Sequence, residues 1–262
     1  MVIRSGSNEK VKQLRKLVKS SKERMENGLY IVEGIRMFRE IPESLLLETY
    51  ISESALEKYE AVISAALCDC HVLSDTVFQS VSDTKSPQGI LAVVRMKAYT
   101  FEDICGCTFD SDKCPFILVA ERLQDPGNLG TIIRSAEAAG VTGIILSNDC
   151  ADIYNPKTVR STMGSLFRMP VYFSDNLKED INILHKNNIK IYGAHLKGES
   201  MYKADFTKPS AFLIGNEGNG LSENIAAEAD ELIYIPMKGG VESLNAAVSA
   251  SVICYEVLRQ RL

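Results

Sequence analysis

The sequence lacks the features that mark several protein classes. No run of apolar residues reaches the length of about 18 that a membrane-spanning helix needs. The N-terminus is basic and has no apolar core of the kind found in signal peptides. Internal repeats and low-complexity tracts are also missing, and the composition excludes collagen and disordered tail proteins. We therefore expect a globular, cytoplasmic protein with no membrane partner.

Regular cysteine spacing is missing as well. The sequence has seven cysteines, an odd number, at Cys68, Cys70, Cys105, Cys107, Cys114, Cys150 and Cys254. Two C-x-C pairs, one of them next to His71, do not match the C-x₂₋₄-C spacing that is usual in zinc sites. We expect reduced thiols and no bound metal.

The charge of the chain is unevenly distributed. The 262 residues are 45% hydrophobic and 24% charged, which suits one large or two modest globular domains. The net charge is −5, yet residues 1–24 carry eight basic and two acidic side chains, so the remainder carries −11. This basic segment either contacts RNA or another polyanion, or is a solvated amphipathic helix that packs through Val11, Leu14, Leu17 and Val18. Both interpretations stay open.

The first half of the chain alternates short strands and helices, which predicts a small α/β domain. The expected strands are 30–34, 45–51, 71–73 and 89–94, and the expected helices are 35–41, 54–67 and 75–81. Residues 97–114 have no sustained periodicity and are interpreted as a linker. We place the boundary near residue 108, which gives domains over 1–108 and 109–262.

The second half alternates more clearly. Continuous apolar strands separated by helices predict a parallel sheet that is covered on both faces. The expected strands are 116–120, 143–146, 171–173, 190–194, 211–215 and 232–235. The expected helices are 128–139, one that begins at Asn155-Pro156, one that Asp175 caps and that runs to Asn187, a short one from Ser222, and 243–262.

Three polar, glycine-containing loops follow strands of this sheet, at the edge where open α/β sheets bind ligands. They lie in residues 121–140, 213–222 and 235–251. Each loop taken alone has a purely structural explanation. Asn128 can cap a helix, and Arg134 can pair with Glu137 one turn later.

Together the three loops resemble a family signature. They contain N-x-G-x-x-x-R at 128–134, I-G-N-E-G-x-G-L-S at 214–222 and I-P-M-x-G-x-x-x-S-L-N at 235–245. This set, in this order, resembles the three motifs of the SpoU (TrmH) family of RNA 2′-O-ribose methyltransferases. YIVEG at 30–34 and SPQGILAVV at 86–94 resemble parts of that family's substrate-binding domain. The resemblance covers almost the whole chain.

The resemblance implies a fold and an activity. The fold would be α/β, with a small N-terminal substrate-binding domain and a C-terminal methyltransferase domain whose last segment threads a trefoil knot. The protein would transfer a methyl group from S-adenosylmethionine to a ribose 2′-hydroxyl in RNA, with ribosomal RNA favoured over transfer RNA. It would act as a homodimer with the site at or near the subunit interface, and without a metal.

The resemblance also assigns roles to individual residues. The catalytic set would be Arg134, Asn128, Glu217, Ser243 and Asn245. The cofactor-binding set would be Leu213, Gly215, Ile235, Met237 and Leu244. Because a guanidinium group in a protein is essentially always protonated, Arg134 is better suited to hold a phosphate or stabilise charge than to act as a base. Glu217 is the only carboxylate of the catalytic set, and we assign it to positioning.

Two alternatives belong to other functional classes. A non-catalytic RNA-binding protein would use only the small domain and the basic helix, and the intact motif residues argue against it. A nucleotide-dependent dehydrogenase would need G-x-G-x-x-G after the first strand of the second domain, and P-G-N-L-G-T at 126–131 does not fit.

Overall fold

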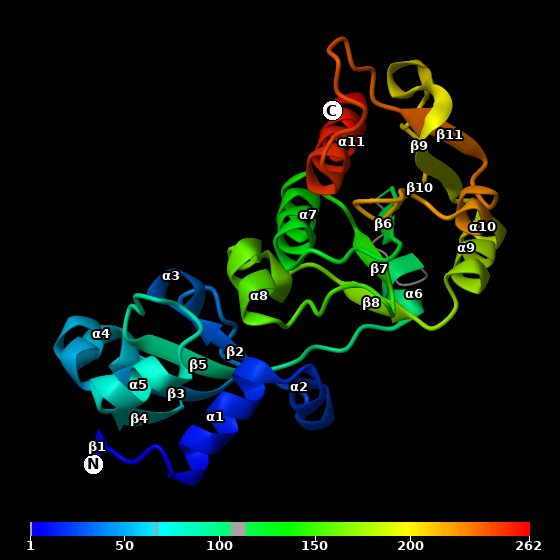
Figure 1. Ribbon diagram of the computed structural model, residues 1–262. Coiled ribbons are helices and arrows are strands. Elements are labelled where there is room, and N and C mark those ends of the chain that lie inside the picture. The colour runs from blue at the N-terminus through cyan, green and yellow to red at the C-terminus, as the bar shows by residue number, and fades with distance from the viewer. Residues whose placement is uncertain (1, 66–67, 106–113) are drawn as a thin grey trace. The chain divides into compact units, whose positions relative to one another are not determined.

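The computed structural model describes residues 2–65, 68–105 and 114–262. The chain forms two compact units, one from residues 1–97 with 152–167 and the other from residues 98–151 with 168–262. Figure 1 labels the elements of both units. The boundary expected near residue 108 lies outside the described residues.

The first unit is built on a mixed sheet, whose order over the described residues is β1-β4-β3-β5-β2. Its strands are β1 (Val2–Ile3), β2 (Leu29–Glu33), β3 (Leu46–Ser52), β4 (Asp69–Leu73) and β5 (Ile90–Arg95). Its helices are α1 (Glu9–Lys19), α2 (Ser21–Asn27), α3 (Ile35–Phe38), α4 (Leu56–Ala65), α5 (Asp75–Val81) and α8 (Pro156–Thr162). The small α/β domain expected from the sequence is confirmed.

The basic N-terminal segment forms two helices, α1 and α2, because Ser20 adopts an extended conformation and caps α2. The apolar face of α1 packs as expected: Val11, Leu14 and Leu17 are buried in the core with residues of β2, β3, β5 and α5. Burying this stripe removes apolar side chains from water and so fixes the helix on the sheet.

Residues 152–167 return to the first unit after β7 of the second, an excursion that the sequence analysis did not anticipate. Arg24 is 2% exposed and donates hydrogen bonds from Nε and Nη2 to Oδ2 of Asp152, at 3.0 and 2.6 Å. The rings of Tyr30 and Tyr154 lie 4.8 Å apart. Because a buried guanidinium without its carboxylate is strongly unfavourable, this ion pair ties the segment to α2.

The second unit is built on a parallel sheet of order β11-β9-β10-β6-β7-β8 over the described residues, in which every neighbouring pair is parallel. Its strands are β6 (Phe116–Ala120), β7 (Gly143–Ser147), β8 (Val171–Ser174), β9 (Lys190–Ser200), β10 (Ser210–Ile214) and β11 (Glu231–Tyr234). Its helices are α6 (Phe101–Cys105), α7 (Pro126–Ala138), α9 (Leu177–Lys186), α10 (Glu223–Ala226) and α11 (Ala246–Arg261). The expected parallel sheet is confirmed.

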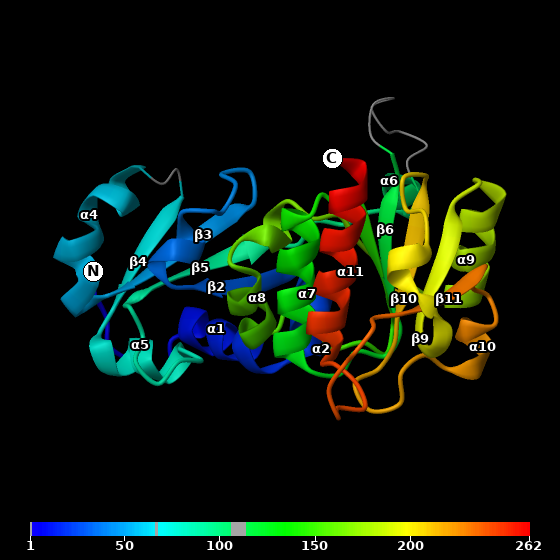
Figure 2. The same cartoon turned by 90° about the horizontal axis from the view of Figure 1, so that it is seen from above.

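Helices cover both faces of this sheet. Helices α7 and α11 lie side by side on one face, whereas α9 and α10 lie on the other (Figures 1 and 2). Residues of α6, α9 and α10 share one core with alternate residues of the strands, such as Ile117, Val119 and Leu213. The intervening strand residues, such as Phe116 and Phe212, turn to the opposite face and stack edge to face.

Two elements differ from the expectations for the second unit. Helix α6 lies inside the expected linker, where its residues Ile104 and Cys105 are buried under the sheet. Strand β9 continues to Ser200 instead of ending at 194. Both elements lie in short polar or glycine-containing stretches that have no clear local pattern. They are ordered by contacts with strands that are distant in the sequence.

Candidate active site

The first loop links β6 to α7. Asp125 caps the helix by accepting a hydrogen bond from the backbone N–H of Asn128 at 2.8 Å. Pro126 occupies the first turn, where its missing N–H costs nothing, so the helix begins before the expected start at Asn128. The alternative that Asn128 is merely a cap is therefore wrong, and its side chain is available for other contacts.

The Asn128 side chain joins the three loops. Its Nδ2 donates to Oε1 of Glu217 in the second loop at 3.2 Å. Its Oδ1 accepts from Nδ2 of Asn245 in the third loop at 3.0 Å. Residues from three distant parts of the sequence thus meet at one amide group, and the structure brings these three predicted catalytic residues together.

Glu217 is held as a carboxylate by N–H donors. The backbone N–H groups of Gln124 and Asp125 donate to its two oxygens, each at 3.1 Å. Burial opposes the charge, but these N–H groups, its own backbone N–H and the Asn128 amide together hold the pKa of Glu217 below its ordinary value. A carboxylate with its lone pairs occupied and a lowered pKa is a weak base, so the geometry fits a positioning role.

The second loop is a tight turn that requires glycine. Backbone hydrogen bonds of 3.0 and 2.9 Å join Asn216 to Gly220 in both directions. A Cβ on Gly215 would lie 2.1 Å from backbone atoms of Gly220 and Leu221, so no larger residue fits there. Gly220 itself has a φ of +67°, in the left-handed region that favours glycine. The glycines of this motif are therefore fixed by backbone packing.

The third loop ends at the start of α11. Asn245 is the N-cap of this helix, and its Oδ1 accepts from the N–H groups of Ala247 and Val248 at 2.9 and 3.3 Å. The helix begins at Ala246, so Ser243 and Leu244 lie in the loop and not in the helix as expected. Asn245 uses its oxygen to cap α11 and its amide to reach Asn128.

The base of the first loop is held by residues that the sequence analysis missed. Arg122 has a φ of +53°, which is strained for a residue with a side chain. Its N–H donates to Ser147 Oγ at 2.9 Å, and its carbonyl accepts from Asn216 Nδ2 at 2.7 Å. The N–H of Leu123 donates to Sγ of Cys150 at 3.3 Å. The only sequence signal for Ser147 and Cys150 was their position after another strand of the parallel sheet.

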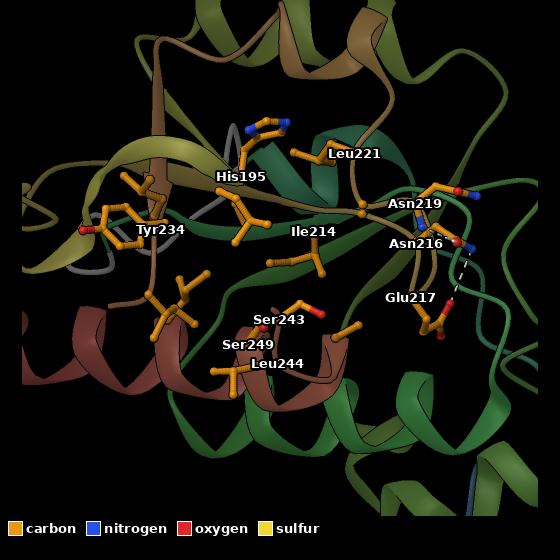
Figure 3. A pocket seen from close by; sticks show the side chains of 18 of the residues that line it. His195, Ile214, Asn216, Glu217, Asn219, Leu221, Tyr234, Ser243, Leu244 and Ser249 are labelled. Atoms are coloured by element: carbon orange, nitrogen blue, oxygen red, sulfur yellow. Dashed lines mark hydrogen bonds between the residues drawn. The ribbon is translucent and has the colours of Figure 1, made fainter. Parts of the chain in front are cut away.

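A cavity of about 450 Å³ opens beside these loops. In Figure 3, Asn216, Glu217 and Asn219 stand at one end and Tyr234 at the other, with Ile214 between them. Ser243, Leu244 and Ser249 approach from the side of α11, and His195 and Leu221 from the opposite side. The walls are mainly apolar with a few polar groups, which is typical of a site for a small organic ligand.

Four of the five predicted cofactor-binding residues line this cavity: Gly215, Ile235, Met237 and Leu244. The fifth, Leu213, is fully buried in the core against α9 and α10, and the strand residue that lines the cavity is Ile214. Successive side chains of a strand point to opposite faces, so a difference of one position reverses the side. Ser243 and Glu217 of the catalytic set also line the cavity.

Arg134 lies on α7, exposed to solvent and outside the cavity lining. The alternative that it pairs with Glu137 is wrong, because Nε of Arg168 lies 2.8 Å from Oε1 of Glu137. Within the described part of the chain, the Arg134 guanidinium has no hydrogen bond or ion pair. It is therefore available to an anionic group of a ligand.

A metal centre is not evident in the described residues, which contain no group of three or more His, Cys, Asp or Glu side chains suited to hold an ion. The cysteines among them are free, and Cys107 lies outside the described range. Burial raises the pKa of Cys254 to about 12, so this thiol is an inert core residue. None of the described helices is long and apolar enough to cross a membrane.

Comparison with known proteins identifies the two units. Residues 115–255 match the SpoU rRNA Methylase family, and residues 8–92 match the MRM3-like substrate binding domain. The chain is 34% identical to the 23S rRNA (guanosine(2553)-2′-O)-methyltransferase RlmP of Bacillus subtilis, with 97% of this chain and 98% of the relative aligned. It is 32% identical to the 23S rRNA (uridine(2479)-2′-O)-methyltransferase of Streptomyces viridochromogenes, over 98% and 92% of the two chains.

The crystal structure of the SpoU methyltransferase AviRb from Streptomyces viridochromogenes, in complex with the cofactor AdoMet, has the same fold. Its TM-score with this chain is 0.87 at 29% sequence identity, over 97% of this chain and 98% of that one. Both the sequence motifs and the three-loop site agree with these matches. The chain belongs to the SpoU rRNA methylase family.

Proposed function

We propose that this protein transfers the methyl group of S-adenosylmethionine to a ribose 2′-hydroxyl of 23S ribosomal RNA. The observation that carries the proposal is the meeting of the three motif loops at Asn128, next to a largely apolar cavity. A protein that only bound RNA through its first unit would have no need for this arrangement.

The residues of the cavity fit S-adenosylmethionine. Apolar walls from Ile214, Ile235, Met237 and Leu244 suit the adenine ring, and Gly215 lines the same cavity. Bound there, the cofactor supplies a methyl group on a positively charged sulfur. Carboxylates line the same cavity, so its charge suits a cationic ligand.

Each residue of the catalytic set has a role that its surroundings support. Arg134 offers a fixed positive charge with a planar fork of donors, which suits an RNA phosphate or the charge that develops during transfer. Asn128 and Asn245 hold the first and third loops together, and Glu217 locks the second loop to the first. Ser243 places a hydroxyl at the wall of the cavity. The positioning of these loops is what would align a ribose oxygen with the methyl group.

The proposed substrate is ribosomal RNA, because two relatives that are at least 30% identical to this chain are named as 23S rRNA methyltransferases. One of these names specifies a guanosine and the other a uridine, so the family match supports the RNA class and not the base. The expected N-terminal domain, residues 1–108, would bind the RNA, because residues 8–92 match a substrate-binding domain. A cytoplasmic location follows from a ribosomal substrate.

We also propose that the protein is a homodimer and that its C-terminal segment is knotted, as the family resemblance implies. The support for the dimer is an apolar face on α11 that points away from its own core. Val248 is 48% exposed and Tyr255 53% exposed, whereas Ala250, Ile253 and Val257 are buried. Exposed apolar side chains along one helix face are typical of a surface that packs against another subunit.

Methyl transfer with a labelled cofactor tests the function. Purified protein, radiolabelled S-adenosylmethionine and 23S rRNA from a strain that lacks the gene should give labelled RNA, and mapping of ribose methylation should find one mark missing in that strain. The Arg134→Ala variant is the matched control, because it should bind the cofactor as the wild type does and give no label. RNA binding without any methyl transfer would support the non-catalytic alternative and refute the proposal.

A further inference from the structure

The pairing of β9 with β11 is interrupted beside the cavity. Leu232 lies opposite Gly193, but the next residue, Ile233, lies opposite Glu199. Residues 194–198 therefore bulge out of the register, and 194–197 line the cavity. A bulge in a strand redirects its side chains, and here it directs them to a ligand site.

Two local contacts give this bulge a defined shape. The backbone N–H of Lys197 donates to Nδ1 of His195 at 3.1 Å, which closes a tight turn. A Cβ on Gly198 would lie 2.3 Å from the backbone carbonyl of Leu232, so the chain returns to β11 at a position where only glycine fits. The family motifs do not include any residue of this bulge.

Some charged side chains that line the cavity already have partners within the protein, and others do not. Lys197 is the only lysine or arginine among the lining residues, and Glu217 and Glu242 are the carboxylates. Glu217 is engaged by the N–H groups of the first loop. Lys197 is exposed and lines the cavity, and in the described part of the chain its ammonium group has no hydrogen bond or ion pair. Lys197 is therefore the cation that an anionic ligand group would meet.

S-adenosylmethionine carries one anionic group, the carboxylate of its methionyl end, beside a cationic sulfur and a cationic amine. The cavity lining offers one cationic and two anionic side chains, the complement of that pattern. We propose that Lys197 binds the methionyl carboxylate, so that the β9 bulge recognises the amino-acid end of the cofactor. This inference rests on the proposed function.

Two ligands that differ only in the carboxylate test the proposed contact with Lys197. They are S-adenosylhomocysteine and decarboxylated S-adenosylhomocysteine. By titration calorimetry the wild type should bind the first about tenfold more tightly than the second, as a charge-assisted hydrogen bond predicts. Lys197→Met should bind both ligands equally, because the partner of the carboxylate is gone. Lys197→Arg should keep most of the preference.

Lys208→Met is the matched control, since Lys208 is exposed in the same unit and does not line the cavity. It should keep the tenfold preference of the wild type. A preference that survives in Lys197→Met, or that is missing in the wild type, overturns the role of Lys197 and leaves the proposed function intact. A wild type that binds neither ligand refutes the proposed function itself.

Discussion

Replacing Asn128 with Asp changes one atom at the point where the three loops meet. The substitution keeps the oxygen that accepts from Asn245 and turns the donor to Glu217 into a carboxylate oxygen. The two atoms lie 3.2 Å apart. At that separation two unit charges repel by about 1 kcal/mol in water and by about 5 kcal/mol at an effective dielectric constant of 20. Because Asn128 is half-buried and Glu217 is exposed, we expect Asn128→Asp to lower the free energy of unfolding by about 2 kcal/mol at pH 7.

The loss should depend on pH in a defined direction. In the wild type the pKa of Glu217 is lowered, so its contribution to stability is present above its ordinary pKa and is lost as the pH falls through the lowered value. In the variant, repulsion raises the pKa of one of the two carboxyls, so the penalty is full at pH 7 and fades as that group takes up a proton. The difference in stability between variant and wild type should therefore shrink as the pH falls to about 4.5.

Chemical denaturation followed by circular dichroism at several pH values measures this difference. Asn224→Asp is the control, because Asn224 is exposed on α10 and should leave stability unchanged within about 0.5 kcal/mol. The double variant Asn128→Asp/Glu217→Gln should recover part of the loss, because the Gln amide can donate to the new carboxylate. A variant as stable as the wild type at pH 7, or a loss of stability that does not shrink in acid, would show that the contact between Asn128 and Glu217 does not stabilise the protein.

Three further changes test the catalytic residue, the basic segment and the dimer. Arg134→Lys should reduce the turnover of methyl transfer on the order of 10²-fold and leave cofactor affinity unchanged, because the planar fork is lost and the charge is kept; a near-normal turnover would make Arg134 structural. Gln in place of four α1 cations should weaken RNA binding. The slope of the logarithm of the RNA-binding constant against the logarithm of salt concentration should become less steep by roughly one unit per lost phosphate contact. An unchanged slope would leave only the interpretation of α1 as a solvated helix. These four are Lys12, Arg15, Lys16 and Lys19. Tyr255→Asp should shift the sedimentation of the protein from dimer to monomer, since it places a charge on the exposed apolar face of α11; an unchanged dimer would place the interface elsewhere.

Several cations of the basic segment have partners within the protein. Lys12 lies 2.7 Å from Glu9, Lys16 lies 3.3 Å from Glu23, and Arg15 donates to the carbonyl of Gly6. Such exposed ion pairs contribute about 0–1 kcal/mol, so these side chains can exchange an acidic partner for a phosphate at little cost. The net charge of residues 1–24 already counts Glu9 and Glu23, but it does not show which cations they pair with.

The class of the fold and the edge of the sheet where the site lies follow from the pattern of apolar residues along the chain. Continuous apolar strands separated by helices require a parallel sheet, and the carboxyl ends of parallel strands meet at one edge, so the loops around Asn128, Glu217 and Asn245 had to be neighbours. The sequence did not fix the first residue of α7, because Asp125 and Asn128 are both good N-caps. The position of Pro126 in the first turn decides for Asp125.

Which side chains face the cavity depends on how distant segments pack against each other. In β10 every residue is buried, so the apolar pattern has no period of two, and the sequence could not distinguish Ile214 at the cavity from Leu213 in the core. The bulge that carries Lys197 lies where the register of β9 and β11 shifts. This register depends on the pairing of two strands that are far apart in the sequence. Contacts of this kind are set by packing between distant segments, so local sequence propensity does not predict them.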